Sequence, residues 1–213
     1  MSLAIVQARM LSQRFPGKVL KDICGKPMLE RVIERVRKSS ATEIIVATSN
    51  DESNKPIYDL CERIGVRCFP YPYEKNVLQR FYLCALGFHK EDPILRITGD
   101  CPLVDPKIID LVISNFKNQY DLVSTSSGYP DGMDVEAFSF AALIRSWREA
   151  TSQEDLEHVT TYMIKHYRVL ELKIDHKVPK LSVDSQVELG RVIDIYKKFG
   201  DNVSLEQIIG LYG

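Results

Sequence analysis

Short apolar segments alternate with amphipathic helical patterns through the first half of the chain, and this alternation limits the possible folds more than any other feature. The strands that it predicts are Leu3–Ala8, Glu43–Thr48, Val66–Phe69, Ile94–Thr98 and Leu122–Ser124. The helices expected between them are Pro27–Lys38, Ile57–Ile64, Leu78–Leu86 and Pro106–Phe116. Because strands that are linked by helices pair in parallel, we predict an α/β fold with a mostly parallel sheet flanked by helices on both faces.

The pattern changes at Gly128, where a turn precedes a new series of short elements. We expect strands over Met133–Phe140 and Val169–Ile174, with two helices between them over Ala141–Ala150 and Asp155–His166. A short strand at Leu181–Val183 and helices at Val187–Phe199 and Leu205–Leu211 complete the prediction. We interpret residues 1–213 as one domain, in which 128–178 is an inserted subregion suited to dimerisation or to contact with a second substrate.

Charge and hydropathy exclude several classes of function. The formal net charge is −1, which argues against non-specific binding to nucleic acid or to an anionic membrane. No apolar run approaches the roughly 18 residues that span a bilayer, and the N-terminus lacks the pattern of a signal peptide. The five cysteines are scattered without a CxxC pair, which indicates a reducing compartment rather than a disulfide framework or a zinc site. We therefore expect a cytoplasmic protein.

A basic stretch directly follows the first predicted strand. The stretch contains Arg9, Ser12 and Arg14, and it ends with a Pro16–Gly17 turn followed by Lys18. A loop at the carboxyl end of a parallel strand opens onto the crevice where α/β proteins bind ligands. Arginine forks and a lysine there suit a polyphosphate, although a solvated surface loop would have the same composition. Residues further along the chain decide between these two interpretations.

Two later strand ends carry acids. Asp100 follows Ile94–Thr98, and Asp184 follows Leu181–Val183. If both strands end beside the basic loop, the two carboxylates suit a Mg²⁺ ion that also takes phosphate oxygens. Each acid has a simpler interpretation, Asp100 as a turn residue and Asp184 as a helix cap. For Asp105 we favour the helix cap.

A further acidic group, which includes Asp134 and Glu136, lacks the spacing of a calcium-binding EF-hand loop and is suited to holding sugar hydroxyls. The histidines have no recognisable metal-ligand spacing. Absent motifs narrow the field: there is no GxxxxGK[ST], no GxGxxG after a strand and no GxSxG. There is also no D-x-D, which transferases that consume nucleotide sugars often use for their metal.

Seven stretches taken together carry a family resemblance. They are Gln7-Ala8-Arg9-Met10-x-Ser12-x-Arg14-x-Pro16-Gly17-Lys18-Val19-Leu20, Gly25-Lys26-Pro27-Met28-Leu29, Asn76-Val77-Leu78-Gln79-Arg80-Phe81, Thr98-Gly99-Asp100-Cys101-Pro102-Leu103, Gly132-Met133-Asp134-Val135-Glu136, Glu157-His158-Val159-Thr160 and Ser182-Val183-Asp184-Ser185. They closely resemble the signature of the cytidylyltransferases that activate acidic sugars, over essentially the whole chain. The nearest branch is similar to the spore-coat polysaccharide biosynthesis proteins, relatives of the CMP-sialate and CMP-3-deoxy-octulosonate synthetases.

The resemblance implies a Rossmann-like fold of the nucleotide-diphospho-sugar transferase type. It also implies a Mg²⁺-dependent, homodimeric enzyme that condenses CTP with an acidic sugar, giving a CMP-sugar and pyrophosphate for surface polysaccharide biosynthesis. Nucleotide binding would fall to Ala8, Arg9, Ser12, Arg14, Gly17, Lys18, Asn76, Leu78, Arg80, Thr98 and Gly99. The implied catalytic residues are Arg9, Lys18 and Asp100, the metal ligands are Asp100 and Asp184, and the acceptor-binding residues are Asp134, Glu136 and His158.

Some positions depart from the family pattern. Asn76 stands where an aspartate is usual, and Leu156 replaces an arginine that commonly precedes Glu-His-Val-Thr. The missing arginine leaves the identity of the acceptor open. Two other interpretations also stay open: a glycosyltransferase of the same fold, which would release a nucleoside diphosphate, and a non-enzymatic nucleotide-binding assembly or regulatory subunit.

Overall fold

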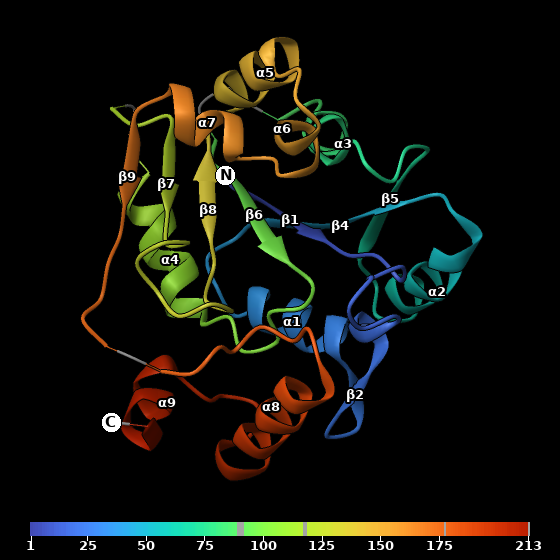
Figure 1. Ribbon diagram of the computed structural model, residues 1–213, viewed down its shortest axis with the longest axis vertical. Helices are drawn as coiled ribbons and strands as arrows, with labels where there is room; N and C mark the ends of the chain where they lie inside the picture. Colours follow the sequence, from blue (N-terminus) through green and yellow to red (C-terminus); the bar gives the residue numbers. More distant parts are fainter. Residues whose placement is uncertain (89–91, 117–118, 177, 213) are drawn as a thin grey trace.

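A seven-stranded sheet forms the centre of the computed structural model, which describes residues 1–88, 92–116, 119–176 and 178–212 (Figure 1). The strand order is β5-β4-β1-β6-β8-β7-β9. Its members are β1 (Leu3–Gln7), β4 (Glu43–Ser49), β5 (Arg67–Tyr71), β6 (Ile94–Thr98), β7 (Leu122–Ser124), β8 (Glu136–Phe138) and β9 (Val169–Glu171). A separate two-stranded pair joins β2 (Asp22–Ile23) to β3 (Lys26–Pro27).

The pairing of β1 aligns the strand ends that carry the predicted site. β1 pairs in parallel with β4 on one side and β6 on the other, so that Gln7 lies between Ala47 and Thr98. β5 continues the parallel arrangement beside β4, and β7 pairs in parallel with β9. β8 runs antiparallel to both β6 and β7. The prediction of a mostly parallel sheet is therefore confirmed, and the residues that follow β1 and β6 emerge at one edge.

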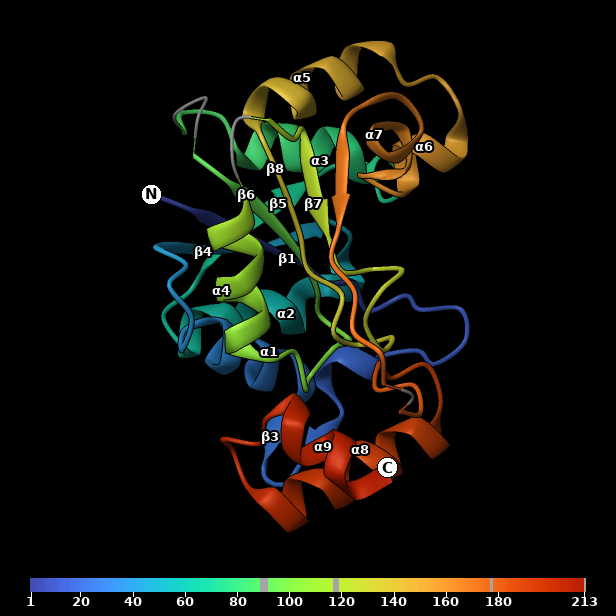
Figure 2. The same ribbon diagram turned by 90° about the vertical axis from the view of Figure 1, so that its left-hand side faces the viewer.

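Helices cover both faces of the sheet, as the sequence predicted. One face packs against α1 (Met28–Val36), α2 (Lys55–Arg63), α4 (Pro106–Asn115), α8 (Gln186–Phe199) and α9 (Leu205–Tyr212). The other packs against α3 (Val77–Cys84), α5 (Phe140–Glu149) and α7 (Thr161–His166), with α6 (Gln153–Glu157) beside α3. Two short 3-10 turns are η1 (Lys18–Leu20) and η2 (Glu52–Asn54). In Figure 2, α5 lies at the opposite end of the molecule from α8 and α9. Residues of β1 alternate between the two cores, as the pleat of a strand requires.

One helix that was predicted as continuous is interrupted in the structure. The single helix expected over Asp155–His166 is two short helices, because the chain leaves the helical conformation at His158. Val159 is fully buried there, and Thr160 donates a hydrogen bond to Glu136 on β8. These tertiary contacts outweigh the helical pattern.

The subregion 128–178 is joined to the main sheet. It supplies β8, inserted between β6 and β7, and β9 at the edge of the sheet. Its proposed part in a homodimer stays a prediction. Among the residues that the structure describes, no helix has the length and apolar character to cross a membrane.

Candidate active site

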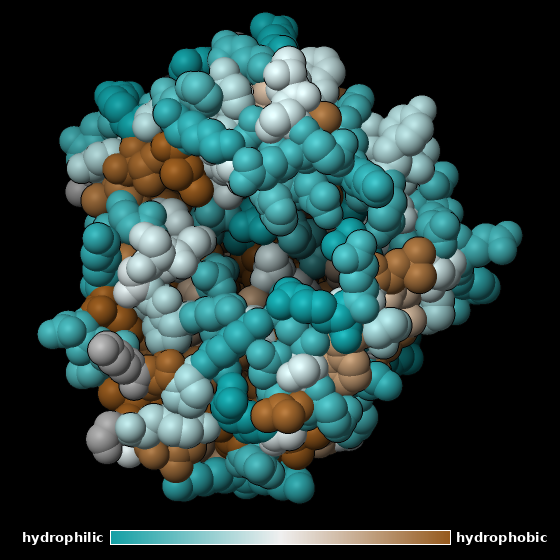
Figure 3. Space-filling view, viewed as in Figure 1, coloured by the Kyte–Doolittle hydropathy of each residue, from teal (hydrophilic) through white to brown (hydrophobic). Residues whose placement is uncertain are grey.

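A cleft of about 750 Å³ lies where β1 and β6 end. Figure 3 shows this face of the molecule hollowed near its centre, with hydrophilic residues around the hollow. Most residues with a role predicted from the sequence line the cleft, namely Ala8, Arg9, Ser12, Arg14, Lys18, Arg80, Thr98, Gly99, Asp100, His158 and Asp184. The lining residues without a predicted role are Gln7, Leu11, Gln13, Val19, Glu74, Lys75, Val77 and Glu157.

Backbone hydrogen bonds hold the basic loop after β1. The Gly17 N–H donates to the Met10 carbonyl (2.8 Å), and the Met10 N–H donates to Asn54 Oδ1 (2.8 Å). Gly17 has φ +69°, a left-handed conformation that glycine adopts at little cost. After this turn the Lys18 side chain points inward and is 9% exposed, whereas that of Arg14, before the turn, is 71% exposed. The turn therefore separates a buried cation from an accessible one.

Lys18 lies between two carboxylates. Its Nζ donates to Asp100 Oδ2 at 2.5 Å and to Asp184 Oδ1 at 2.6 Å. Burial by itself would lower the pKa of Lys18, but the two carboxylates outweigh it, so the pKa is raised. Lys18 therefore carries its positive charge throughout the neutral pH range. This arrangement places one cation and two hard oxygen donors at one point of the cleft.

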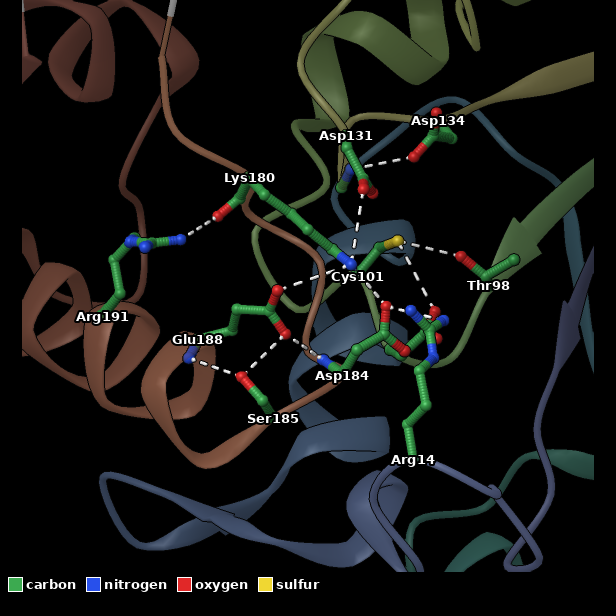
Figure 4. Close-up of polar contacts among 12 residues, drawn as sticks. Arg14, Thr98, Cys101, Asp131, Asp134, Lys180, Asp184, Ser185, Glu188 and Arg191 are labelled. Atoms are coloured by element: carbon green, nitrogen blue, oxygen red, sulfur yellow. Dashed lines mark hydrogen bonds and ion pairs between the residues drawn. The ribbon is translucent and has the colours of Figure 1, made fainter.

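The interpretation of Asp184 as a helix cap is wrong. Ser185 is the N-cap of α8, and its Oγ accepts from the Glu188 N–H, while Glu188 Oε2 accepts from the Asp184 N–H (2.6 Å). The Asp184 carboxylate instead faces Lys180 Nζ at 2.5 Å and Arg14 Nη2 at 2.9 Å (Figure 4). Burial would raise the pKa of Asp184, but hydrogen bonds from the lysines outweigh it and lower the pKa. Asp184 is therefore an ionised group aimed at the cleft.

The strand predicted over Leu181–Val183 does not form. The N–H groups of Leu181 and Ser182 both donate to the Asp131 carbonyl, at 2.7 and 3.2 Å, and the Val183 N–H donates to the Asp100 carbonyl at 2.9 Å. The donors that a strand would use in a ladder are taken by these two loops. The same bonds bring the backbone before Asp184 directly against that of Asp100.

Asp100 and Asp184 fit a divalent cation. Their carboxylates converge on one atom, Lys18 Nζ, and supply the hard oxygen donors that Mg²⁺ prefers. Within the described ranges, no group of three or more His, Cys, Asp or Glu side chains could hold a metal. The donor set therefore suits an ion that also takes oxygens from a phosphate ligand, rather than one held by protein alone.

Arg9 lies between two glutamates that had no predicted role. Its guanidinium is 3.8 Å from Glu74 Oε1, which follows β5, and 3.8 Å from Glu157 Oε1, at the end of α6. The Arg9 side chain is 42% exposed, so these ion pairs are screened by solvent. The pairing could not be anticipated, because it depends on how β5 and α6 approach β1. The two glutamates therefore partly neutralise the positive charge that Arg9 offers to a ligand in the cleft.

Some residues assigned to the nucleotide lie outside the lining of the cleft. Asn76 is the N-cap of α3, with Oδ1 accepting from the Gln79 N–H at 3.0 Å. Asparagine and aspartate both cap helices well, so this role is kept despite the departure from the family pattern. Leu78 is fully buried in the core, and Gly17 shapes the turn. That Asn76, Leu78 and Gly17 contact the nucleotide stays a prediction.

Two residues assigned to the acceptor are also absent from the lining. Glu136 is 2% exposed and accepts hydrogen bonds from Arg96 Nη1 (2.5 Å) and Thr160 Oγ1 (2.9 Å). Arg96 Nε in turn donates to Gln7 Oε1 (3.3 Å) at the floor of the cleft. Asp134 accepts from the Gly132 N–H, and burial raises its pKa to about 6. Hydrogen bonds through Arg96 thus link Glu136 to Gln7, which lines the cleft, and direct contact of either acid with an acceptor stays a prediction.

Comparison with known proteins assigns the chain to a family. Residues 3–207 match the model of a protein family described as cytidylyltransferase. The chain is 32% identical over 224 residues to the spore coat polysaccharide biosynthesis protein SpsF of Bacillus subtilis, covering 98% of this chain and 92% of that protein. The resemblance found from the sequence motifs is confirmed.

Solved structures show the same fold. A cytidylyltransferase from Leptospira borgpetersenii superposes with a TM-score of 0.92 at 23% identity, covering 99% of this chain and 92% of that one. A CMP:2-keto-3-deoxy-manno-octonic acid synthetase in complex with CTP superposes with a TM-score of 0.73 at 17% identity, covering 92% and 98%. At these identities the likeness is one of fold.

Proposed function

The chain belongs to the cytidylyltransferase family, and from this premise we propose that it transfers the cytidylyl group of CTP to a hydroxyl of a sugar. The observation that carries the proposal is the position of Lys18 between Asp100 and Asp184, in a cleft bordered by Arg9 and Arg14. This combination offers cations to phosphate oxygens and carboxylates to a metal at the same point.

In the proposed reaction a hydroxyl oxygen of the sugar attacks the α-phosphorus of CTP. The bond between that phosphorus and the oxygen bridging to the β-phosphorus breaks, and pyrophosphate leaves while the hydroxyl proton passes to solvent. Lys18, which is buried and charged, would stabilise charge on the reacting phosphate. Arg14, which is mostly exposed, would hold the departing oxygens in its fork. The protein thus acts chiefly by positioning and charge stabilisation, as in other phosphate transfers.

We propose Asp100 and Asp184 as the holders of Mg²⁺. When bound, the ion would supply Lewis-acid polarisation of phosphate oxygens. Val183 directly precedes Asp184, and the hydrogen bond from its N–H to the Asp100 carbonyl holds the two aspartates close together. Ser185 and Glu188 satisfy the end of α8, so the Asp184 carboxylate does not cap the helix and faces the cleft instead.

For the acceptor we propose an acidic sugar used in surface polysaccharide synthesis. Support comes from two similar proteins: SpsF is named for spore coat polysaccharide biosynthesis, and the synthetase of like fold is named for an acidic sugar. His158, which is exposed and lines the cleft, is the residue that we assign to the acceptor.

A screen for pyrophosphate release tests the proposed function. The wild-type protein is incubated with each of four nucleoside triphosphates against a panel of acidic sugars and sugar phosphates, with Mg²⁺ or with EDTA. We expect release with CTP and an acidic sugar, its loss in EDTA, and a fall of more than tenfold in Asp100→Ala, since tenfold is about 1.4 kcal/mol of transition-state stabilisation. Asp194→Asn, an exposed carboxylate on α8, is the control. A parallel incubation with nucleotide sugars tests the glycosyltransferase alternative: release of a nucleoside diphosphate there, without pyrophosphate release in the screen, would contradict the proposal.

A further inference from the structure

The ammonium group of Lys18 lies in the space between the two carboxylates that we assign to the metal. Its Nζ is 2.5 Å from Asp100 Oδ2 and 2.6 Å from Asp184 Oδ1. A Mg²⁺ ion bound by the same two oxygens would approach each of them to about 2.0–2.1 Å. The ammonium and the ion cannot both lie between the same two oxygens. The position of Lys18 and the binding of a metal therefore exclude each other.

The charges at this point of the cleft are already balanced by the protein itself. Arg14 Nη2 lies 2.9 Å from Asp184 Oδ2, and Lys180 Nζ lies 2.5 Å from the same oxygen. Lys18 and Arg14 by themselves offset the two negative charges of Asp100 and Asp184. A divalent cation that entered alone would meet repulsion from these cations at short range. The free protein therefore offers little attraction to a metal ion.

Lys180 differs from Lys18 in the acids that it contacts. Among the described residues, its ion pairs beyond Asp184 are with Asp131 Oδ2 at 3.6 Å and Glu188 Oε1 at 3.5 Å (Figure 4). Lys180 therefore does not lie between the two aspartates and can keep its partners when an ion binds there. Lys18 has to give up its place.

The backbone of Lys18 is fixed, whereas its side chain can turn. The Lys18 N–H donates to the Phe15 carbonyl at 3.2 Å, and the Lys21 N–H donates to the Lys18 carbonyl at 3.0 Å. These bonds hold η1 and do not involve the ammonium group. A lysine side chain has a flexible four-carbon stem, and that of Lys18 lines the cleft. The ammonium can thus move to a ligand in the cleft without a change in the loop.

We propose that the Lys18 ammonium holds the place of the metal in the free protein and passes to a phosphate oxygen when nucleotide and metal enter together. This proposal rests on the proposed function, which assigns the metal to Asp100 and Asp184. A metal ion that arrives alone has to displace the ammonium while no new anion receives it. A triphosphate supplies that anion and also gives oxygens to the metal. Lys18 thereby makes metal binding depend on the nucleotide.

The test measures binding of Mn²⁺ alone, as a probe, from the paramagnetic resonance signal of the free ion. In Lys18→Met, which keeps an unbranched side chain without the charge, we expect Mn²⁺ to bind more than about tenfold more tightly than in wild type. Lys18→Arg keeps a cation and should bind Mn²⁺ as weakly as wild type. Circular dichroism checks folding. Lys18→Gln, which keeps an amide donor without the charge, carries the same expectation should the methionine variant not fold.

Lys180→Met is the matched control. It removes an ammonium that is also 2.5 Å from Asp184 but does not lie between the two aspartates. We expect it to change the affinity for Mn²⁺ by less than about threefold. Adding Asp184→Asn to Lys18→Met should abolish the gain, which locates the ion at this site.

Two results would overturn the proposal. An equal gain in Lys180→Met would show a general effect of charge, and equal affinity in wild type and Lys18→Met would show that Lys18 does not hold the place of the ion. The proposed function is judged separately by the pyrophosphate screen. Mg²⁺-dependent release by the wild-type chain together with either result would remove the role of Lys18 in the free protein and leave the proposed function standing.

Discussion

Lys18 Nζ lies 2.6 Å from Oδ1 of Asp184, a residue 166 positions further along the chain. This ion pair joins the loop that follows β1 to the segment that precedes α8. The Asp184 side chain is 10% exposed and that of Lys18 is 9% exposed, so solvent screens the pair only weakly. The site is therefore assembled from the two ends of the chain, and it depends on the whole fold.

Replacing Lys18 by alanine should lower turnover by more than tenfold while the fold is retained. The change removes the cation that faces the reacting phosphate, and tenfold corresponds to about 1.4 kcal/mol of transition-state stabilisation. Pyrophosphate release with CTP and the accepted sugar is the measurement. Lys21→Ala, an exposed lysine above the Phe15 ring, should keep wild-type turnover. Near wild-type release from a folded Lys18→Ala would rule out the role given to this residue.

The buried ion pair of Arg96 and Glu136 should contribute strongly to stability. Arg96→Met leaves a carboxylate that is 2% exposed with Thr160 as its remaining donor, and we expect a loss of about 3 kcal/mol in the free energy of unfolding. Glu136→Gln should cost less, since an amide still accepts from both neighbours. Urea unfolding of the two single variants and the double variant gives the coupling energy, expected to exceed about 1 kcal/mol. Additive losses would show that the pair is not coupled.

Much of the fold and part of the site could be predicted from local patterns. The strand over Ile94–Thr98 was predicted at its observed ends, because a short apolar run is flanked by turn residues. Asp105 is the helix cap that its place before a proline indicated, with its carboxylate accepting from the Lys107 N–H. The basic loop and Asp100 were found because each follows a buried strand and so lies at the carboxyl edge of the sheet.

Other features depend on contacts between distant segments and left no local signal. Arg9 pairs with Glu74 and Glu157 because of the packing of β5 and α6 beside β1. Lys180 pairs with Asp184, four positions further along the chain, and this contact depends on the hydrogen bonds from Leu181 and Ser182 to the Asp131 carbonyl. The position of β8 between β6 and β7 also depends on contacts between distant segments. β8 has only three residues, and its sequence pattern is too short to specify which strands lie beside it.

Two glycines should respond to alanine in opposite directions. At Gly132, φ is +103°, and an added Cβ would lie 2.4 Å from the backbone nitrogen of Ser182. We expect Gly132→Ala to lower the free energy of unfolding by more than about 2 kcal/mol, through backbone strain and this clash. Gly190, inside α8, has open space around a Cβ, so Gly190→Ala should raise it by about 0.5–1 kcal/mol. Thermal or urea unfolding separates the two. Equal effects at both positions would contradict the close packing of the segments around residues 132 and 182.

Asp134 should make the protein less stable as the pH rises from about 4 to 6. Burial raises the pKa of its carboxyl from 3.8 to about 6, so in this range the folded chain holds a proton that the unfolded chain has lost. The free energy of unfolding falls with pH wherever the folded state binds more protons, and this contribution levels off above the folded pKa.

In Asp134→Asn the amide oxygen can still accept from the Gly132 N–H, but the side chain no longer titrates. The stability of the variant relative to wild type should therefore increase between pH 4 and pH 6 and stay constant above about pH 7. Urea unfolding at a series of pH values measures this difference, with the exposed Asp194→Asn as control. A difference that is independent of pH would show that Asp134 titrates normally in the folded chain.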